Sequence, residues 1–532
     1  MSRGAPPVLS ALVAAWVALA PSASAQAPTP LHPADPAYRH LSVLEDAGLV
    51  PRGLTATGAL SSARVRWLVA DARRWLSAGA AHPGRLEHDL EAALRALEAR
   101  FPEEGSGAAV TTGELELGGG RSPGRGVPTT DLGSTDASVN PLASALGVGS
   151  GGRAFGDRST AALAVRVDVP LGGAAGLSLG GRGSVLRAAG ATPHRDGAVA
   201  EAVALHVRLG RLSLGLGRQS FQGGSPGLTP LSLGPELPPL DALRLATDRP
   251  VPMLLLGDVD LQLFAADLGP RQFHPHTKLF GVMVSARPVP ALEVGLTLLN
   301  KQGGDGAPEA TLAERLRDVS WVGNWFVDDE PNISDKQIGV GARLRTRGLR
   351  LDAEAAFTDF DHQRPDHTFR QAAGYRLAVE AVAVDGVGRH ALGLEGASLG
   401  PHVYRHQPFR SGWAVERFPM GWPLDPDSES LSVWHRYRAP ASGVEVRTAV
   451  ALDRRSADGW RPSEFIVDQL VRVDDRPEEW RARATLDART DLHDGRTTVT
   501  LGLGGERVRS FGFVQGADRT NWAFRLAVWR AF

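Results

Sequence analysis

The strongest constraint on the fold of this chain is an alternation of apolar and polar side chains with a period of two residues. It begins near residue 108 and continues to the last residue. In 160–171, for example, Val165 and Val167 fall on one side of the alternation and Arg166 on the other. Because successive side chains of a strand point to opposite faces, the pattern predicts many strands with one apolar face. The alternation recurs in 203–209, 349–357, 444–450 and 499–503.

The length and the turns of this region distinguish between two kinds of β protein. The region spans 109–532, whereas one immunoglobulin-type sandwich needs only about 100 residues. Tight turns such as 209–212 and 346–349 alternate with long glycine-rich loops such as 122–157, an asymmetry typical of outer-membrane barrels. At about 10 residues per membrane-spanning strand plus connections, we predict an all-β transmembrane barrel of roughly 16 to 18 antiparallel strands.

The end of the chain also has the form of a barrel strand. Trp522, Phe524, Leu526 and Val528 alternate up to the terminal Phe532. The bacterial barrel-assembly machinery recognises a terminal aromatic residue on an amphipathic last strand. We therefore expect this machinery to be a partner through the C-terminal strand, and outer-membrane lipid to contact the apolar faces.

The first residues predict a secretory signal peptide. Arg3 supplies a positive charge, 8–20 is apolar, and the Ala-Ser-Ala of 23–25 fits a small-residue cleavage site. The alternative is a membrane anchor, but the apolar run is shorter than the ~20 residues that a spanning helix needs. We predict a signal peptide over 1–25 and export of the mature chain to the bacterial outer membrane.

The next part of the chain forms a separate unit. Within 36–101 apolar residues recur at helical spacing in three short stretches, which predicts three amphipathic helices. Because barrel ends normally stay in the periplasm, we expect this unit to be periplasmic. The predicted domains are a helical domain with its linker over 26–107 and the outer-membrane barrel over 108–532.

The composition excludes several classes of function. The 58 lysine and arginine residues are balanced by 59 acidic ones, for a net charge of −1. This balance excludes a nucleic-acid binder that works by bulk positive charge. The chain has no cysteine, so disulfide frameworks, thiolate zinc sites and cysteine nucleophiles are excluded together.

Serine hydrolase motifs are incomplete. None of the Gly-x-Ser-x-Gly strings lies between a predicted strand and a predicted helix, as a nucleophile elbow requires. The serines of these strings are Ser178, Ser225 and Ser398. We predict no catalytic residue, although an outer-membrane hydrolase remains an alternative from another class. Its polar residues would include Asp359, Asp361 and His362.

Metal motifs are incomplete as well. His274 and His276 lie on the same side of an extended segment, but no third ligand is near them in the sequence. Asp425, Asp427 and Glu429 have the spacing of a calcium loop, yet the central glycine and the glutamate at position twelve are missing. We therefore predict no metal and no cofactor.

Two polar loops carry tryptophans beside carboxylates. Those of the first loop are Trp321, Trp325 and Asp328, and those of the second are Trp422, Asp425 and Asp427. Aromatic faces stack on sugar rings, and carboxylates accept hydrogen bonds from sugar hydroxyls. We predict that these six residues bind saccharide. The alternative is that the tryptophans lie in the interfacial belt of the membrane, where tryptophan is enriched.

Short motifs along the mature chain occur in the order of a known family. They are Asp35-Pro-Ala-Tyr-Arg-His-Leu, Gly217-Arg-Gln-Ser-Phe, 238–245, Pro290-Ala-Leu-Glu-Val-Gly-Leu, Ser334-Asp-Lys-Gln-Ile-Gly and Met420-Gly-Trp-Pro-Leu-Asp-Pro-Asp. In these motifs the chain resembles the Wzi-type capsule-assembly family of outer-membrane barrels. The resemblance implies an 18-stranded occluded barrel, a periplasmic helical domain and a lectin-like role in fixing capsular polysaccharide. Residues 222–226 depart from the family, in which an aromatic commonly precedes the Gly-Pro turn.

These observations lead to one hypothesis and two alternatives. The hypothesis is an outer-membrane barrel, not an enzyme, that binds or anchors surface (capsular) polysaccharide. The first alternative is an outer-membrane porin or channel, which would conduct ions in planar bilayers, and the less favoured one is the hydrolase. The expected partners are surface polysaccharide, outer-membrane lipid and the barrel-assembly machinery, with no nucleic acid.

Overall fold

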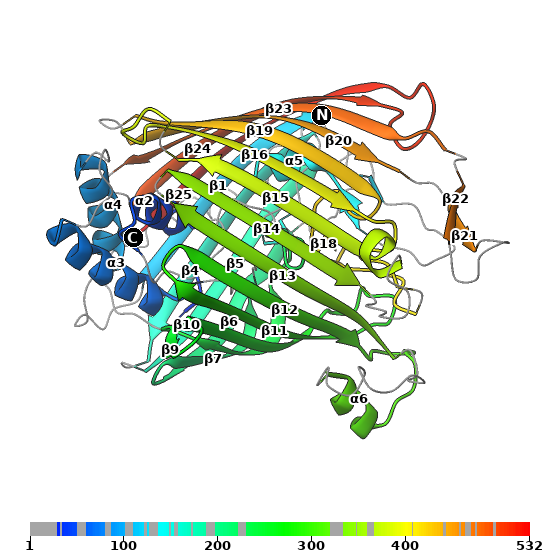
Figure 1. Ribbon diagram of the computed structural model, residues 1–532, viewed down its shortest axis with the longest axis horizontal. Helices are drawn as coiled ribbons and strands as arrows, with labels where there is room; N and C mark the ends of the chain where they lie inside the picture. The colour runs from blue at the N-terminus through cyan, green and yellow to red at the C-terminus, as the bar shows by residue number, and fades with distance from the viewer. Residues whose placement is uncertain are drawn as a thin grey trace, which may run out of the picture.

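The computed structural model describes 29–31, 35–50, 60–79, 87–101, 110–121, 125–126, 137–147, 151–153, 158–171, 174–187, 197–221, 230–319, 333–346, 348–358, 367–382, 384–406, 408–439, 443–456, 459–462, 470–473, 476–492 and 496–532. The predicted signal peptide lies outside these residues. The described chain has two parts, a helical unit and a barrel (Figure 1).

The N-terminal unit consists of three helices, which confirms the helical periodicity. Their bounds are α2 Ala37–Asp46, α3 Ser62–Ser77 and α4 Glu87–Arg100. At the start of α3 the Ser61 side chain accepts a hydrogen bond from the Arg64 N–H at 3.1 Å, the usual form of an N-cap. The apolar faces of the helices share one core that contains Leu44, Leu68 and Leu94.

Eighteen strands of the described chain close into one antiparallel barrel, at the upper end of the predicted range. Most strands pair with their neighbours along the chain, so the topology is up-and-down. Their bounds are β1 Val110–Arg121, β4 Ser159–Pro170, β5 Ala175–Arg187, β6 Gly197–Leu209, β7 Leu212–Gln219, β8 Leu240–Thr247, β10 Gly257–Asp267, β11 Lys278–Val289, β12 Leu292–Gln302, β13 Ser334–Thr346, β14 Leu349–Thr358, β15 Ala373–Ala381, β16 His390–Leu399, β19 Ser428–Ala439, β20 Val444–Arg455, β23 Glu479–Leu492, β24 Thr497–Arg509 and β25 Arg519–Ala531.

Shorter elements lie in the connections. They are β2 Arg125–Gly126, β3 Ser138–Val139, α5 Pro141–Ala145, β9 Val251–Met253, α6 Leu312–Val319, the π-helical turn η2 His367–Gln371, β17 Ala414–Val415, β18 Phe418–Pro419, β21 Gly459–Pro462 and β22 Leu470–Val473. Among them β9 pairs with the barrel strand β10.

The first and last strands close the barrel. β1 and β25 pair continuously from Thr112 opposite Ala531 to Arg121 opposite Trp522. The Phe532 N–H also donates a hydrogen bond to the Thr111 carbonyl at 2.9 Å. Closure leaves neither strand with an unpaired edge, which a spanning sheet must avoid in lipid.

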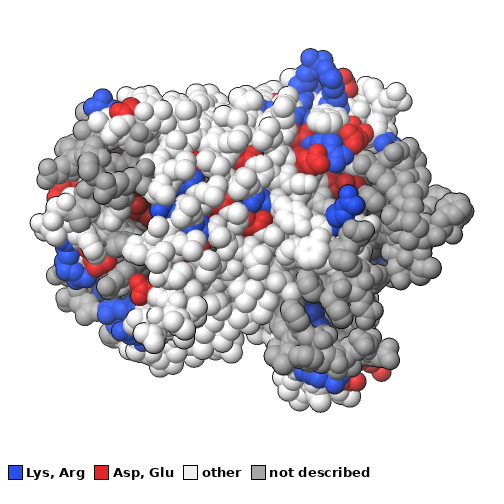
Figure 2. Space-filling model, in the orientation of Figure 1, with Lys and Arg blue, Asp and Glu red and all other residues white. Residues whose placement is uncertain are grey.

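The outer wall is apolar and the inner wall carries most of the charge. On β24, Leu501 and Leu503 are 40% and 46% exposed, whereas Glu506 on the opposite face is 3% exposed. Figure 2 shows uncharged residues over most of the barrel surface, with charged residues at its two ends and a smaller group visible in the middle. No helix in the described part of the chain is both long and apolar enough to cross a membrane.

The two ends of the barrel differ in their connections. At the end that carries α2, α3 and α4, strands are joined by short turns such as 210–211 and 290–291. At the opposite end the connections are long, as in 220–239 and 400–427. We name these the helix end and the loop end (Figure 1).

Several loops from the loop end pack against the inner wall. α5 contacts β24 and β25, and its Leu142 shares a small apolar cluster with Ala523 of β25. Two other loops meet inner-wall residues in a larger cluster, which we name the loop core. Its loop members include Leu231, Leu233, Tyr404, Trp413, Met420 and Trp422, and its wall members include Phe264, Met283, Leu299 and Leu399.

Candidate functional site

The loop core is built around buried aromatic side chains. Trp413 is fully buried, and its indole N–H donates a hydrogen bond to an Asp335 carboxylate oxygen of β13 at 3.2 Å. The Tyr404 hydroxyl donates to the Leu231 carbonyl of the neighbouring loop. It also accepts a hydrogen bond from the Trp422 backbone N–H at 3.1 Å. These bonds join two loops to each other and to the barrel wall.

Three of the predicted saccharide residues lie in the same structure. Trp422, Asp425 and Asp427 are all buried, at 6%, 0% and 5% exposure. The Asp425 N–H donates to the Trp422 carbonyl at 3.0 Å, and the Asp427 N–H donates to the Gly400 carbonyl at 3.2 Å. Their direct contact with a saccharide stays a prediction, and such contact would require this loop to open.

The two carboxylates face a buried cation. Burial lowers the pKa of Arg405, and the charges of Asp425 and Asp427 oppose that change. Arg405 is 3% exposed. The aspartates therefore compensate charge inside the loop end, a role that the sequence pattern alone does not distinguish from ligand binding.

The first of the two predicted saccharide loops lies outside the described part of the chain. Trp321, Trp325 and Asp328 lie outside the described residues. The described chain before them ends in α6, and it resumes at Ile333 ahead of β13. Their saccharide contact stays a prediction.

An exposed aromatic side chain lies elsewhere at the loop end, in the connection between β10 and β11. Phe273 is 50% exposed, and its ring forms an edge contact with His274 at 4.8 Å between centroids. The Arg410 guanidinium lies 5.4 Å from the centre of the Phe273 ring. We name Phe273, His274 and Arg410 the aromatic patch.

Hydrogen bonds hold the aromatic patch on the loop core. The Phe273 N–H donates to the Ser411 hydroxyl at 2.6 Å, and the neighbouring Gln272 amide donates to the Ala414 carbonyl at 3.0 Å. His274 Nε2 lies 2.8 Å from the Pro408 carbonyl. A ring held in place beside a cation and hydrogen-bonding groups is suited to stack on a sugar. His274 stands out in the sequence as one of a pair of histidines, whereas the only sequence signal of Phe273 is a single aromatic residue in a polar turn.

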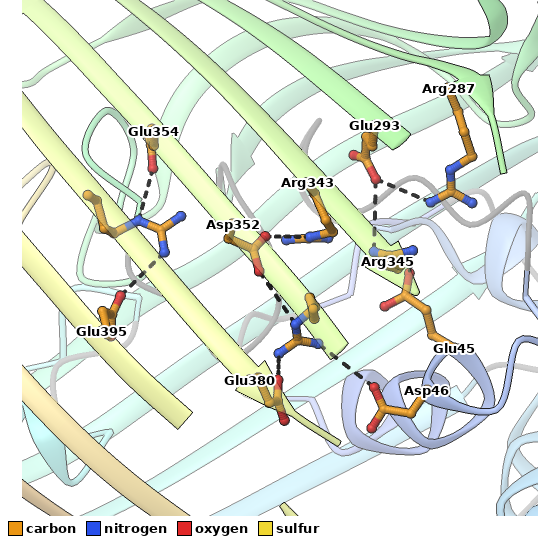
Figure 3. A network of polar contacts seen from close by, with 12 residues as sticks. Glu45, Asp46, Arg287, Glu293, Arg343, Arg345, Asp352, Glu354, Glu380 and Glu395 are labelled. Atoms are coloured by element: carbon orange, nitrogen blue, oxygen red, sulfur yellow. Dashed lines mark hydrogen bonds and ion pairs between the residues drawn. The ribbon is translucent and has the colours of Figure 1, made fainter. Parts of the chain in front are cut away.

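At the helix end the last two residues of α2 enter a group of arginines (Figure 3). Asp46 lies 3.2 Å from Arg436, 3.5 Å from Arg438 and 3.9 Å from Arg350, all on barrel strands. Arg350 and Arg436 also pair with Glu380 of β15. Asp46 thus contacts two strands of the barrel, β14 and β19, and Glu380 of β15 links two of the same arginines.

Glu45 makes the matching contact next to it. Its carboxylate lies 2.6 Å from the Arg345 guanidinium of β13. Arg345 lies 3.9 Å from Glu293 of β12, which pairs with Arg287 of β11 at 3.2 Å. Glu45 and Asp46 therefore fix the end of α2 across neighbouring strands, as Figure 3 shows.

A third contact of α2 lies nearly two turns earlier. Arg39 pairs with Asp491 near the end of β23, and His40 Nε2 lies 3.5 Å from the same carboxylate. Burial lowers the pKa of Arg39 to about 10, so the guanidinium stays charged at neutral pH. Burial and the nearby Arg39 charge lower the pKa of His40 well below its ordinary value, so the imidazole is neutral.

The described residues contain no cluster suited to bind a metal ion. No group of three or more histidines and carboxylates in them is placed to hold a metal ion. His276 Nδ1 lies 3.1 Å from Asp267, which also pairs with Lys278 at 2.7 Å. Ser178 and Ser398 lie within the strands β5 and β16, away from the strand-to-helix turn that a nucleophile elbow needs.

Comparison with known proteins shows which family the chain resembles. The family model described as capsule assembly protein Wzi matches residues 174–523, and no curated protein matches the chain. One similar solved structure is Wzi of Escherichia coli, an outer membrane protein involved in group 1 capsule assembly and described as a carbohydrate-binding β-barrel. Its TM-score is 0.62 at 13% identity, and the match covers 94% of this chain and 99% of that one.

Other barrels are less similar. OccD3 (OpdP) and OprD of Pseudomonas aeruginosa have TM-scores of 0.46 and 0.44 at 11% identity. Each match covers 80% of this chain, with 91% and 95% of the respective structures. The family model matches 350 of the 532 residues, which is more than half of the chain. The chain therefore belongs to the capsule assembly protein Wzi family of outer-membrane β-barrels.

Proposed function

We propose that this barrel binds a surface polysaccharide of the capsular kind and holds it at the outer face of the outer membrane. The observation that carries the proposal is the family match over 174–523, which contains most of the barrel. The fold likeness to Wzi of Escherichia coli, a carbohydrate-binding barrel, agrees with it.

The loop end is the place where we expect the polysaccharide to bind. The aromatic patch supports this choice, because Phe273 presents an open ring beside the guanidinium of Arg410. The loop that contains Trp321, Trp325 and Asp328 is proposed as a second contact region. For Trp422, Asp425 and Asp427 we propose an indirect role, since their buried contacts fix the loop beneath the patch. The proposed role is binding and anchoring, without a catalytic step.

This proposal includes an orientation. We place the helix end in the periplasm and the loop end outside the cell, since outer-membrane barrels have short periplasmic turns and long external loops. The C-terminal Phe532, which directly follows β25 at the helix end, would then be presented to the periplasmic barrel-assembly machinery. Outer-membrane lipid would contact the apolar outer wall.

Two measurements on purified protein test the function. Binding of short capsular oligosaccharides, followed by calorimetry, should be saturable, and an unrelated oligosaccharide should not bind. Single-channel recording in planar bilayers should show little steady conductance, because the loop core occupies the inner wall. Steady conductance without oligosaccharide binding would replace this proposal with the porin alternative.

A further inference from the structure

An unusual apolar tip projects from the helix end. The connection between β8 and β10 carries β9, which pairs with β10 from Val251 opposite Val259 to Met253 opposite Gly257. Beyond this pairing, Leu254 is 101% exposed and Leu255 is 87% exposed. No other large hydrophobic residue of the described chain is as exposed as these two.

The tip belongs to a larger apolar surface. Val289 at the end of the neighbouring strand β11 is 51% exposed, and Trp75 near the end of α3 is 41% exposed. Together with Met253 and Leu254 they line one open hollow of about 720 Å³ between α3 and the barrel rim. We name this surface the rim patch. Its apolar members are Trp75, Val251, Met253, Leu254, Leu255, Leu256 and Val289.

Exposure of the rim patch to water is unfavourable. Removal of apolar surface from water is favourable roughly in proportion to its area, and contiguous apolar patches on proteins mark contact sites. Other described turns at the same end expose single apolar residues, such as Leu171 at 53% and Val384 at 54%, but none as fully as Leu254 and Leu255, and others are polar, for example Arg496 before β24. The apolar tip is thus a property of this hairpin and not of the helix end as a whole.

The rim patch is continuous with the lipid-facing wall. Val251 is the cross-strand partner of Val259 on the outer face of β10, and Leu243 on the outer face of β8 is 49% exposed. The outward apolar row of β10, which includes Leu261 and Val259, therefore continues into the tip at Val251.

Side chains beside the patch fit the boundary of a phospholipid layer. Arg249 is exposed at the base of the hairpin, and Arg74 is exposed next to Trp75 while it pairs with Asp71 at 2.8 Å. Tryptophan is enriched where acyl chains meet headgroups, and cationic side chains attract anionic lipid. The hollow is also lined by one carboxylate, that of Asp258.

We propose that the rim patch inserts into the adjoining membrane leaflet, where Leu254 and Leu255 lie among the phospholipid acyl chains. The helical unit would then be held by the membrane through Trp75 as well as by the barrel through Glu45 and Asp46. The identity of the leaflet as the inner one rests on the orientation under Proposed function, whereas the insertion itself does not.

The absence of cysteine from the chain allows a direct test. A Leu254→Cys protein is labelled with a polarity-sensitive fluorophore and reconstituted in vesicles of phosphatidylethanolamine and phosphatidylglycerol. Lipids with a nitroxide on the acyl chain should quench this probe several-fold more strongly than a matched probe at Arg496→Cys. Aqueous iodide should show the reverse order. Adding Leu255→Ser should reduce the lipid quenching at Leu254→Cys.

The other outcomes overturn the proposal. If iodide quenches both probes equally and lipid nitroxide quenches neither, the tip lies in water. If both quenchers fail and unlabelled Leu254→Cys protein cross-links to dimers, a second copy of the chain covers the patch. Heat-modifiable gel mobility confirms that each variant contains a folded barrel. No saccharide is present, so the result is independent of polysaccharide binding.

Discussion

The two ends of this barrel are held together by different interactions. At the helix end, Glu45 and Asp46 of α2 reach arginines on the strands. At the loop end, loops bury apolar side chains such as Trp413 against the inner wall. A buried ion pair stabilises a contact only when both charged partners are present and well oriented. Apolar packing instead stabilises a contact when the side chains fill the available volume. The comparison indicates that the helix end specifies how a separate unit docks, while the loop end forms a packed support for a surface.

Single strands show how the sequence encodes this difference. The inward residues of β14 run from Arg350 and Asp352 near the helix end to Ala356 near the loop end. On β10 they run from Asp260 to Phe264. On these two strands the inner face changes from charged to uncharged toward the loop end. Other strands keep buried ion pairs at the loop end, such as Lys301 with Asp335 at 3.0 Å.

The largest effect is expected from a cavity in the loop core. Replacing a fully buried aromatic side chain by alanine typically costs about 3–5 kcal/mol, so Trp413→Ala should strongly lower the temperature at which heat-modifiable mobility is lost. It should also raise conductance in planar bilayers, because the loops lose their central contact. Trp480→Ala is the matched control, since Trp480 is 47% exposed on the outer wall. Equal behaviour of the two variants would contradict the importance of the loop core.

The second largest effect is expected from the ion pairs at the helix end. Removing one partner of a buried ion pair costs about 3 kcal/mol or more when no other partner is left. Asp46→Ala should cost less than that, since Arg350 and Arg436 keep Glu380. We expect the helical unit to become sensitive to added protease in detergent while the barrel stays intact. Glu98→Ala, which breaks a half-exposed pair with Arg73, should leave protease resistance unchanged.

The sequence predicted the strands better than the site, for a physical reason. Alternation in 160–171 and 349–357 reports which face of a strand is apolar, and the structure confirms β4 and β14 there. A tryptophan in a polar loop gives no such information. The sequence around Trp422 would be the same whether its ring faced water or a loop core. Whether the ring is buried depends on contacts with residues distant in sequence, such as that with Tyr404.

The loop end also contains an ionisable group that makes its packing depend on pH. Burial raises the pKa of Glu236 to about 7, against a hydrogen bond from Ser144 that lowers it. A raised pKa means that ionisation costs the folded state, so stability should fall as pH rises from about 4.5 to 7 and then level off. From the size of the shift, the loss is about 3 kcal/mol.

A variant that cannot ionise separates this effect from the rest of the protein. Glu236→Gln keeps an acceptor for Ser144 and should make the melting temperature nearly constant between pH 5 and pH 8. Glu309→Gln, an exposed residue of the β12–β13 connection, serves as the control and should retain the wild-type slope. A Glu236→Gln protein with that same slope would assign the pH dependence to another group.

The smallest effect is expected at the aromatic patch, where the loop core meets the proposed ligand. A lost stacking partner costs about 1 kcal/mol, or about fivefold in Kd, so Phe273→Ala should weaken binding of short oligosaccharides by that factor. Long polymer should mask the loss, because linked sites raise the effective concentration. Phe369→Ala is the control: Phe369 is 47% exposed, but its ring packs against Phe357 on the outer wall. If both variants bind short oligosaccharide like wild type and Trp413→Ala does too, the loop end supports no saccharide surface at this patch. Weaker binding by Phe273→Ala alone, with an unchanged melting temperature, would place the ligand on the exposed ring that the loop core holds in position.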